Sequence, residues 1–186
     1  MDIIEKVKNF VEQECGKPES KYGFEPFEFH FVPVVRYAER LCDELGGDRE
    51  VISIAAWMHD IGSIVYGRED HHITSAKIAV EKLSEFGYPQ EKIGFVEKCI
   101  LNHRGSQKRG RETLEEQIVA EADVLANFDE IAGIFKAAFV YEGLTQGQAR
   151  ESVLQKLTNK FEQLHFEKSK EIIRPKFEAV KILLGK

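Results

Sequence analysis

The sequence predicts an all-α protein that folds as one compact helical domain over residues 1–186. Apolar residues recur at three- and four-residue spacings along most of the chain, and no stretch alternates apolar and polar residues as a half-buried strand does. Glycine, proline and capping residues divide the sequence into segments of helical length. With 42% hydrophobic and 31% charged residues, the composition is ordinary for a soluble globular protein, and the chain can bury a sizeable core.

The first three expected helices begin and end at recognisable residues. The first covers about residues 2–15 and is amphipathic. The second carries Pro33 in its first turn, where the missing N–H has no intrahelical partner in any case, and it ends near Gly46. The third has Asp48 as its N-cap and ends around Gly62.

Similar signals mark the helices that follow. After an expected loop at residues 63–70, a helix runs from about His71 to Phe86. Pro89 opens another helix, which extends to His103. Long amphipathic helices take up the end of the chain. Two capping boxes are also present, Thr113 with Glu116 and Thr145 with Gln148. A shorter apolar helix is expected between them, at about residues 129–141.

Charge and cysteine content limit the classes of function. A formal net charge of −6 argues against broad electrostatic binding to a nucleic acid polymer or an anionic membrane. No apolar stretch is long enough to cross a bilayer, and the first ten residues contain too many charges for a secretory signal. The three cysteines form no CxxC motif and cannot all pair, so we expect reduced thiols in a cytoplasmic protein.

Six side chains able to bind a metal ion fall on or beside the inward faces of successive helices. His59 lies four residues after the apolar Ala55, for example, and His103 lies three after Ile100. A histidine or carboxylate that faces a core needs a hydrogen bond, an ion pair or a metal ion to offset the cost of burial. One such histidine is usually an ordinary core residue, but six donors indicate a shared site. They are His30, His59, Asp60, His71, His103 and Asp123.

The order and spacing of these residues resemble the HD superfamily of metal-dependent phosphohydrolases. His30 is followed, after 28 residues, by the dipeptide His59-Asp60, and Asp123 lies 63 positions after Asp60 within EADVLA. The segments HHITSA and ILNHRG look like the additional histidine motifs of HD subgroups that hold more than four ligands. The resemblance covers about residues 26–140, and the all-helical fold of that superfamily agrees with the expected helices.

The resemblance implies that a divalent cation is bound by four of these side chains: His30, His59, Asp60 and Asp123. Two imidazoles and two carboxylates suit Mn, Fe, Co, Ni or Zn better than Mg. His71 and His103 would either complete the site of a second ion, bridged by the catalytic Asp60, or line the pocket and bind substrate. The adjacent His72 is expected to face solvent at the start of its helix.

A dense basic cluster follows His103 and offers candidate ligands for phosphate. Beside a metal site such side chains neutralise phosphate oxygens, and the alternative is a solvated surface loop. Pro33 stands where many HD relatives carry a basic residue three positions after the first histidine, so any phosphate contact must come from elsewhere. The cluster consists of Arg104, Lys108 and Arg109, with Arg111 two residues further on.

The resemblance implies hydrolysis of a phosphate ester or anhydride by a metal-activated water. The expected substrate is a nucleotide or another small phosphorylated metabolite, with one or two metal ions as cofactors and a monomer or homodimer as the assembly. Two alternatives stay open. Some HD relatives with six ligands hold a di-iron pair and carry out oxygen-dependent oxidation. A non-catalytic, metal-stabilised helical binding module is the other.

Overall fold

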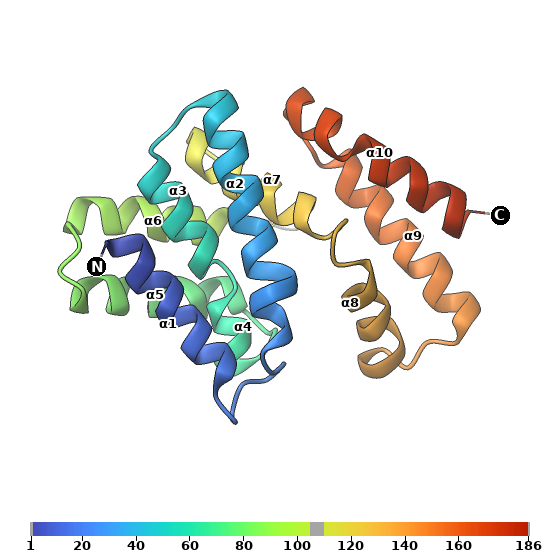
Figure 1. Cartoon of the computed structure of the whole chain (residues 1–186), viewed down its shortest axis with the longest axis horizontal. Coiled ribbons are helices and arrows are strands. Elements are labelled where there is room, and N and C mark those ends of the chain that lie inside the picture. Colours follow the sequence, from blue (N-terminus) through green and yellow to red (C-terminus); the bar gives the residue numbers. More distant parts are fainter. Residues whose placement is uncertain (1, 105–109, 186) are drawn as a thin grey trace. The chain divides into compact units, whose positions relative to one another are not determined.

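The computed structural model of the chain describes residues 2–104 and 110–185, and every regular element in these residues is a helix (Figure 1). The predicted all-α class is therefore confirmed. The chain divides into two compact units, Met1–Asp123 and Val124–Lys186. The expectation of a single domain stays a prediction.

The first unit contains all six candidate ligands. Its central helix, α3, is buried at every residue from Val51 to Met58 and packs against α1, α2, α5 and α6. The elements in chain order are α1 (Ile3–Gly16), the π-helical turn η1 (Phe27–Phe31), α2 (Val32–Leu45), α3 (Arg49–Met58), α4 (Ile61–Tyr66), α5 (His71–Glu85), α6 (Gln90–Asn102) and α7 (Leu114–Ala126), which continues past the boundary between the units.

Two of the predicted helix starts use the expected caps in this unit. The Asp48 side chain accepts hydrogen bonds from the Glu50 and Val51 N–H groups in the first turn of α3. At α7, Thr113 Oγ1 accepts from the Glu116 N–H at 3.2 Å. The second half of that expected capping box is not formed as predicted, because the Glu116 carboxylate accepts from Asn102 Nδ2 at 2.8 Å instead.

The expected helix that ends around Gly62 is interrupted, and the first part of the expected loop at 63–70 is helical in α4. Asp60, with φ −115° and ψ 12°, breaks the regular helix. The Gly62 N–H donates to Ser75 Oγ of α5 at 2.8 Å, so a tertiary contact holds the start of α4. The break leaves His59 and Asp60 at a junction between two helices.

His30 lies inside the π-helical turn η1, which leads directly into α2. The Val32 N–H donates to the Phe27 carbonyl, five residues earlier. Pro33 has no N–H with which to close an α-helical bond to the Phe29 carbonyl, and this favours the wider turn. The helix around His30 therefore begins earlier than predicted.

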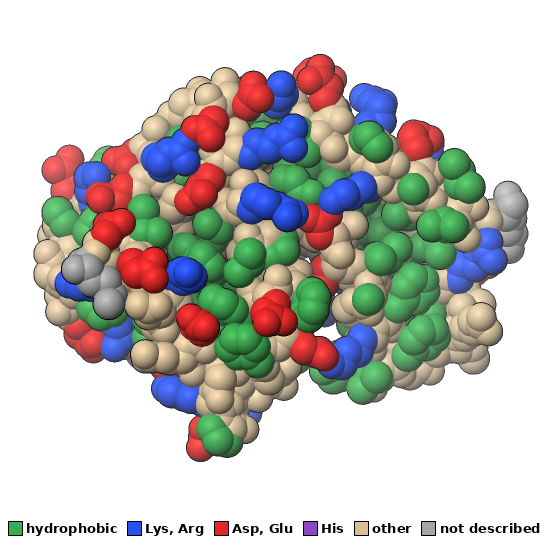
Figure 2. All heavy atoms as spheres, in the orientation of Figure 1, with side chains coloured by type: hydrophobic (Ala, Val, Ile, Leu, Met, Phe, Trp, Pro, Cys, Tyr) green, Lys and Arg blue, Asp and Glu red, His purple; other side chains and the backbone are tan. Residues whose placement is uncertain are grey.

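The second unit consists of a short helical segment and a packed helix pair. Here α9 packs against α10 and against η2, and the predicted capping box of Thr145 and Gln148 is present at the start of α9. Nowhere in the described residues is a helix long and apolar enough to span a membrane. On the face shown in Figure 2, acidic and basic side chains are interspersed with apolar ones. The elements are α8 (Ile131–Lys136), the π-helical turn η2 (Ala137–Tyr141), α9 (Gln146–Glu162) and α10 (Glu167–Leu184).

Candidate metal centre

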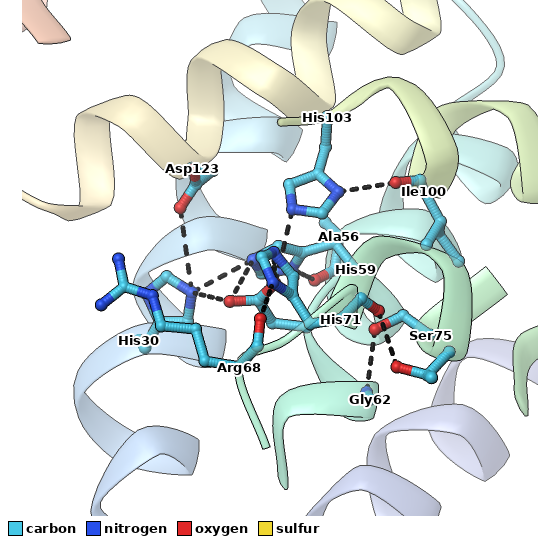
Figure 3. Close-up of polar contacts among 12 residues, drawn as sticks. His30, Ala56, His59, Gly62, Arg68, His71, Ser75, Ile100, His103 and Asp123 are labelled. Carbon is cyan, nitrogen blue, oxygen red and sulfur yellow. Dashed lines mark hydrogen bonds and ion pairs between the residues drawn. The ribbon is translucent and has the colours of Figure 1, made fainter. Parts of the chain in front are cut away.

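The six candidate ligands converge in the first unit, where the ends of several helices meet (Figure 3). Two overlapping groups each bring one donor atom per residue within 4.8 Å of one another: His30 with His59 and Asp123, and His59 with Asp60 and His103. The ligands come from η1 (His30), the junction of α3 and α4 (His59 and Asp60), the start of α5 (His71), the residue after α6 (His103) and α7 (Asp123).

Three of the histidines are oriented by the same kind of hydrogen bond. In each ring Nδ1–H donates to the backbone carbonyl three residues earlier. Since a carbonyl oxygen can only accept, the proton lies on Nδ1, and the neutral ring presents a bare Nε2. Metal-binding imidazoles are usually held in this way. The pairs are His59 with Ala56 at 2.8 Å, His71 with Arg68 at 2.9 Å, and His103 with Ile100 at 2.6 Å.

The Asp60 carboxylate lies between two pairs of histidines. Its Oδ2 is 3.5 Å from His30 Nε2 and 3.9 Å from His59 Nε2. Its Oδ1 is 3.2 Å from His71 Nε2 and 3.4 Å from His103 Nε2. Each oxygen thus faces one pair of histidine nitrogens, and the carboxylate could contribute to a cation site on either side.

Asp60 Oδ1 provides a test of whether a cation fits this site. The atom is buried and no donor reaches it with hydrogen-bond geometry. When the His71 and His103 rings are neutral, the nitrogens that face this oxygen are bare, because the ring proton lies on Nδ1. Their lone pairs and the carboxylate repel one another, whereas a cation between them attracts all three. The donor set therefore fits a metal ion.

The distance between the His30 and His59 nitrogens, which face Asp60 Oδ2, also suits one ion bound by both rings. His30 Nε2 and His59 Nε2 are 3.1 Å apart. Two nitrogens at right angles around one ion, each about 2.1 Å from it, would be about 3.0 Å apart. Asp123 Oδ1 lies 3.8 Å from His30 Nε2 and supplies a carboxylate to the same side.

Burial and neighbouring charges shift the pKa values of the central groups in different directions. Burial lowers the pKa of His59 to about 4, so this imidazole is neutral at neutral pH. Burial acts to raise the pKa of Asp60, but His59 and the other histidines outweigh it, and the pKa lies well below its ordinary value. For His103, burial opposes the charged form, and the adjacent Asp60 more than offsets this, which raises the pKa.

The two adjacent histidines at the start of α5 have different surroundings. His71 directs Nε2 toward Asp60, whereas the His72 ring meets the His71 ring edge-on, with 5.9 Å between ring centroids. His72 is only 4% exposed, so the expectation that it faces solvent is wrong. Burial lowers its pKa, and the nearby His71 and Arg104 lower it further.

The basic cluster after His103 is only partly within the described structure. Arg104 is partly buried, and its charge helps to lower the pKa of His72 at the start of α5. Lys108 and Arg109 lie outside the described residues. Arg111 is held by the protein itself, because its guanidinium donates to the carbonyl oxygens of Asn102 and His103.

Sequence reasoning did not identify the groups that support the ligands. Ser75 is fully buried and accepts the Gly62 N–H next to the ligand junction. Glu116 is 1% exposed and binds Asn102, the residue before His103. The sequence shows each of these as a polar residue on an apolar helix face. It does not reveal that Ser75 bonds Gly62 or that Glu116 bonds Asn102.

The HD domain family model matches residues 28–127, which include all six candidate ligands. Bacillus subtilis YpgQ, solved in complex with ADP, is 19% identical and aligns over 97% of this chain and 93% of its own, with a TM-score of 0.72. An HD-superfamily hydrolase from Bacillus thuringiensis is 20% identical over 97% of this chain and 92% of its own, with a TM-score of 0.74.

A match to a curated protein is more local. An uncharacterized protein of Clostridium beijerinckii is 38% identical over 79 residues, which are 40% of this chain and 50% of that protein. The chain spans half or less of the length of the curated relatives that it matches. The two solved structures show the same fold as this chain.

Proposed function

The chain belongs to the HD-domain family, and from this premise we propose that it is a metal-dependent phosphohydrolase. The proposed substrate is a nucleotide or another small phosphorylated metabolite. The observation that carries the proposal is the position of the Asp60 carboxylate, whose two oxygens face separate pairs of histidine nitrogens. This arrangement supports two cation positions that share one carboxylate.

The donor set indicates which ions the site would hold. Imidazole and carboxylate ligands suit Mn, Fe, Co, Ni or Zn better than Mg. A bound cation would acidify a water molecule and polarise a phosphoryl oxygen. In the proposal, Asp60 contributes to both positions. The other ligands are His30, His59 and Asp123 on one side and His71 and His103 on the other.

The side chains around the site would orient and neutralise the substrate. The rings of His59, His71 and His103 are already fixed by their Nδ1 hydrogen bonds, so little reorganisation would accompany the reaction. Arg104, directly after His103, is proposed to bind a phosphate oxygen, with Lys108 and Arg109 as further substrate ligands.

A nucleotide is the first substrate class to test. YpgQ, which shares the fold over nearly the whole chain, was solved with ADP. The proposed arginine and lysine ligands would suit a diphosphate or triphosphate, because several phosphate oxygens then need neutralising charges.

The experiment is a phosphate-release screen on protein stripped of metal and reloaded with each candidate ion. Nucleoside mono-, di- and triphosphates and sugar phosphates are the substrates, and Asp60→Asn is the inactive control. We expect release that depends on the ion and is lost in the control. No release with any ion and substrate would contradict the proposal.

The alternative functions give different results in the same samples. A six-ligand di-iron oxygenase would retain iron and consume oxygen, since the same nitrogen and oxygen donors also suit iron. A non-catalytic binding module would hold metal and show neither activity. Cytoplasmic localisation and a monomeric or homodimeric state stay predictions.

A further inference from the structure

Arg111 joins the segment before α7 to the end of α6. Its Nε donates to the Asn102 carbonyl oxygen at 3.0 Å, and its Nη2 donates to the His103 carbonyl oxygen at 3.2 Å. The last carbonyls of a helix have no intrahelical donors, and the helix dipole favours a positive charge there. The planar guanidinium can serve two consecutive carbonyls at once, which a single ammonium group does less well.

The same end of α6 is held from a second direction. Asn102 Nδ2 donates to Glu116 Oε2 at 2.8 Å, and the Glu112 N–H donates to the same oxygen at 3.3 Å. Glu116 belongs to α7 and is almost completely buried. Burial lowers the pKa of Arg111, but acidic groups that include Glu116 favour its charged form. The backbone at 102–103 is therefore fixed from both sides.

This backbone carries a candidate ligand whose orientation matters. The His103 ring is buried, its Nδ1–H donates to the Ile100 carbonyl, and its Nε2 lies 3.4 Å from Asp60 Oδ1. A small rotation of the backbone at His103 would move Nε2 away from Asp60. Figure 3 shows the His103 ring above His59 and His71, with one ring nitrogen directed to the Ile100 carbonyl oxygen.

We propose that Arg111 is a positioning residue that holds His103 as a ligand of a second cation, on the side of Asp60 that also faces His71. The proposal rests on the two-cation site of the proposed function. The hydrogen bonds of Arg111 go to the end of α6, which supplies His103 alone. Loss of the Arg111 side chain should therefore weaken binding of the second cation and leave binding of the ion near His30 and His59 unchanged.

The test is a titration of metal-free, full-length protein with Co²⁺, followed by calorimetry and by the visible absorption of the bound ion. The wild type should bind two ions. Arg111→Met should bind one with wild-type affinity and the second about 10- to 100-fold more weakly, as loss of a group that supports a ligand usually does. Arg111→Lys should lie between them.

Arg150→Met is the matched control. Arg150 also donates through Nε and Nη2 to two consecutive carbonyls at a helix end, those of Leu184, the last residue of α10, and Gly185. The Arg150→Met variant removes the same hydrogen-bond donors from a helix end in the second unit. We expect this variant to bind two Co²⁺ ions with wild-type affinities and spectrum.

Each other outcome has a distinct meaning. Two ions bound to Arg111→Met with wild-type affinities and spectrum would overturn the role of Arg111. If Arg111→Met does not fold, as judged by circular dichroism, Arg111→Lys decides, and a wild-type second affinity there would overturn the role. A wild type that binds one ion would overturn both the role and the two-cation site. Two ions without phosphate release would overturn the proposed hydrolysis alone.

Discussion

Replacing Gly62 by alanine should force apart α4, which directly follows the ligand Asp60, and α5, which begins at the ligand His71. Gly62 lies in α4, two residues after Asp60, and an added Cβ would be 2.6 Å from the Ser75 nitrogen and 2.7 Å from the His71 carbonyl oxygen of α5. It would also be 2.1 Å from Thr74 Oγ1. Backbone atoms cannot rotate away as a side chain can, so α4 and α5 must separate.

The size of the effect follows from these distances. Relief of the backbone contacts requires a shift of somewhat less than 1 Å, and overpacking of this kind costs about 1–3 kcal/mol. The hydrogen bond from the Gly62 N–H to Ser75 Oγ would also weaken, which adds about 1 kcal/mol. His71 begins α5 and moves with it, and a displacement of about 1 Å in a reacting centre can reduce the rate by about 10²-fold.

Urea denaturation, Co²⁺ titration and phosphate release measure these three consequences. We expect Gly62→Ala to lose about 2–4 kcal/mol of unfolding free energy, to bind the second ion weakly and to have low activity. Gly94→Ala is the control, because its Cβ in α6 meets nothing within 4 Å, and it should be neutral or slightly stabilising. Wild-type stability and two-ion binding in Gly62→Ala would refute the reasoning.

Three further perturbations test other parts of the structure. Asp60→Asn removes the charge between the histidine pairs, so phosphate release should fall at least about 100-fold with unchanged far-ultraviolet circular dichroism; full activity would contradict the role of Asp60. Ser75→Ala leaves the buried Gly62 N–H without its acceptor and should cost about 1–3 kcal/mol in urea denaturation; no loss would contradict that role. The Lys92 hydrogen bond lowers the pKa of Glu50, so this ion pair stabilises the fold above the ordinary carboxyl pKa, and the contribution disappears as the pH falls through the lowered value. Since their side chains are 38% and 37% exposed, Glu50→Gln should cost less than about 1 kcal/mol at neutral pH; a cost in thermal unfolding that does not diminish as the pH is lowered through the acid range would contradict this assignment.

Local sequence signals were enough for the helices and for the identity of the candidate ligands. Asp48 and Thr145 cap α3 and α9 as predicted, since capping depends on residues a few positions apart. The histidines could be found because each lies at helical spacing from an inward-facing residue: His59 and His103 follow Ala55 and Ile100, whereas His30 precedes Val34 and His71 precedes Ser75.

Features that depend on distant residues could not be predicted in this way. The helix expected to reach Gly62 is interrupted where Gly62 packs on α5 and bonds Ser75. Arg111 has the charge and the sequence position expected of a phosphate ligand, yet its guanidinium donates to carbonyl oxygens at the end of α6. Its partners lie eight and nine positions earlier, and no periodic pattern connects them.

Anomalous X-ray diffraction at the Mn absorption edge, from crystals grown with Mn²⁺, tests the central claim most directly. The claim is that the Asp60 carboxylate lies between two cations. Two anomalous peaks should appear on opposite sides of this carboxylate, each bonded to Nε2 atoms of one histidine pair. A map with fewer than two peaks bonded to Asp60 and these histidines would contradict the claim.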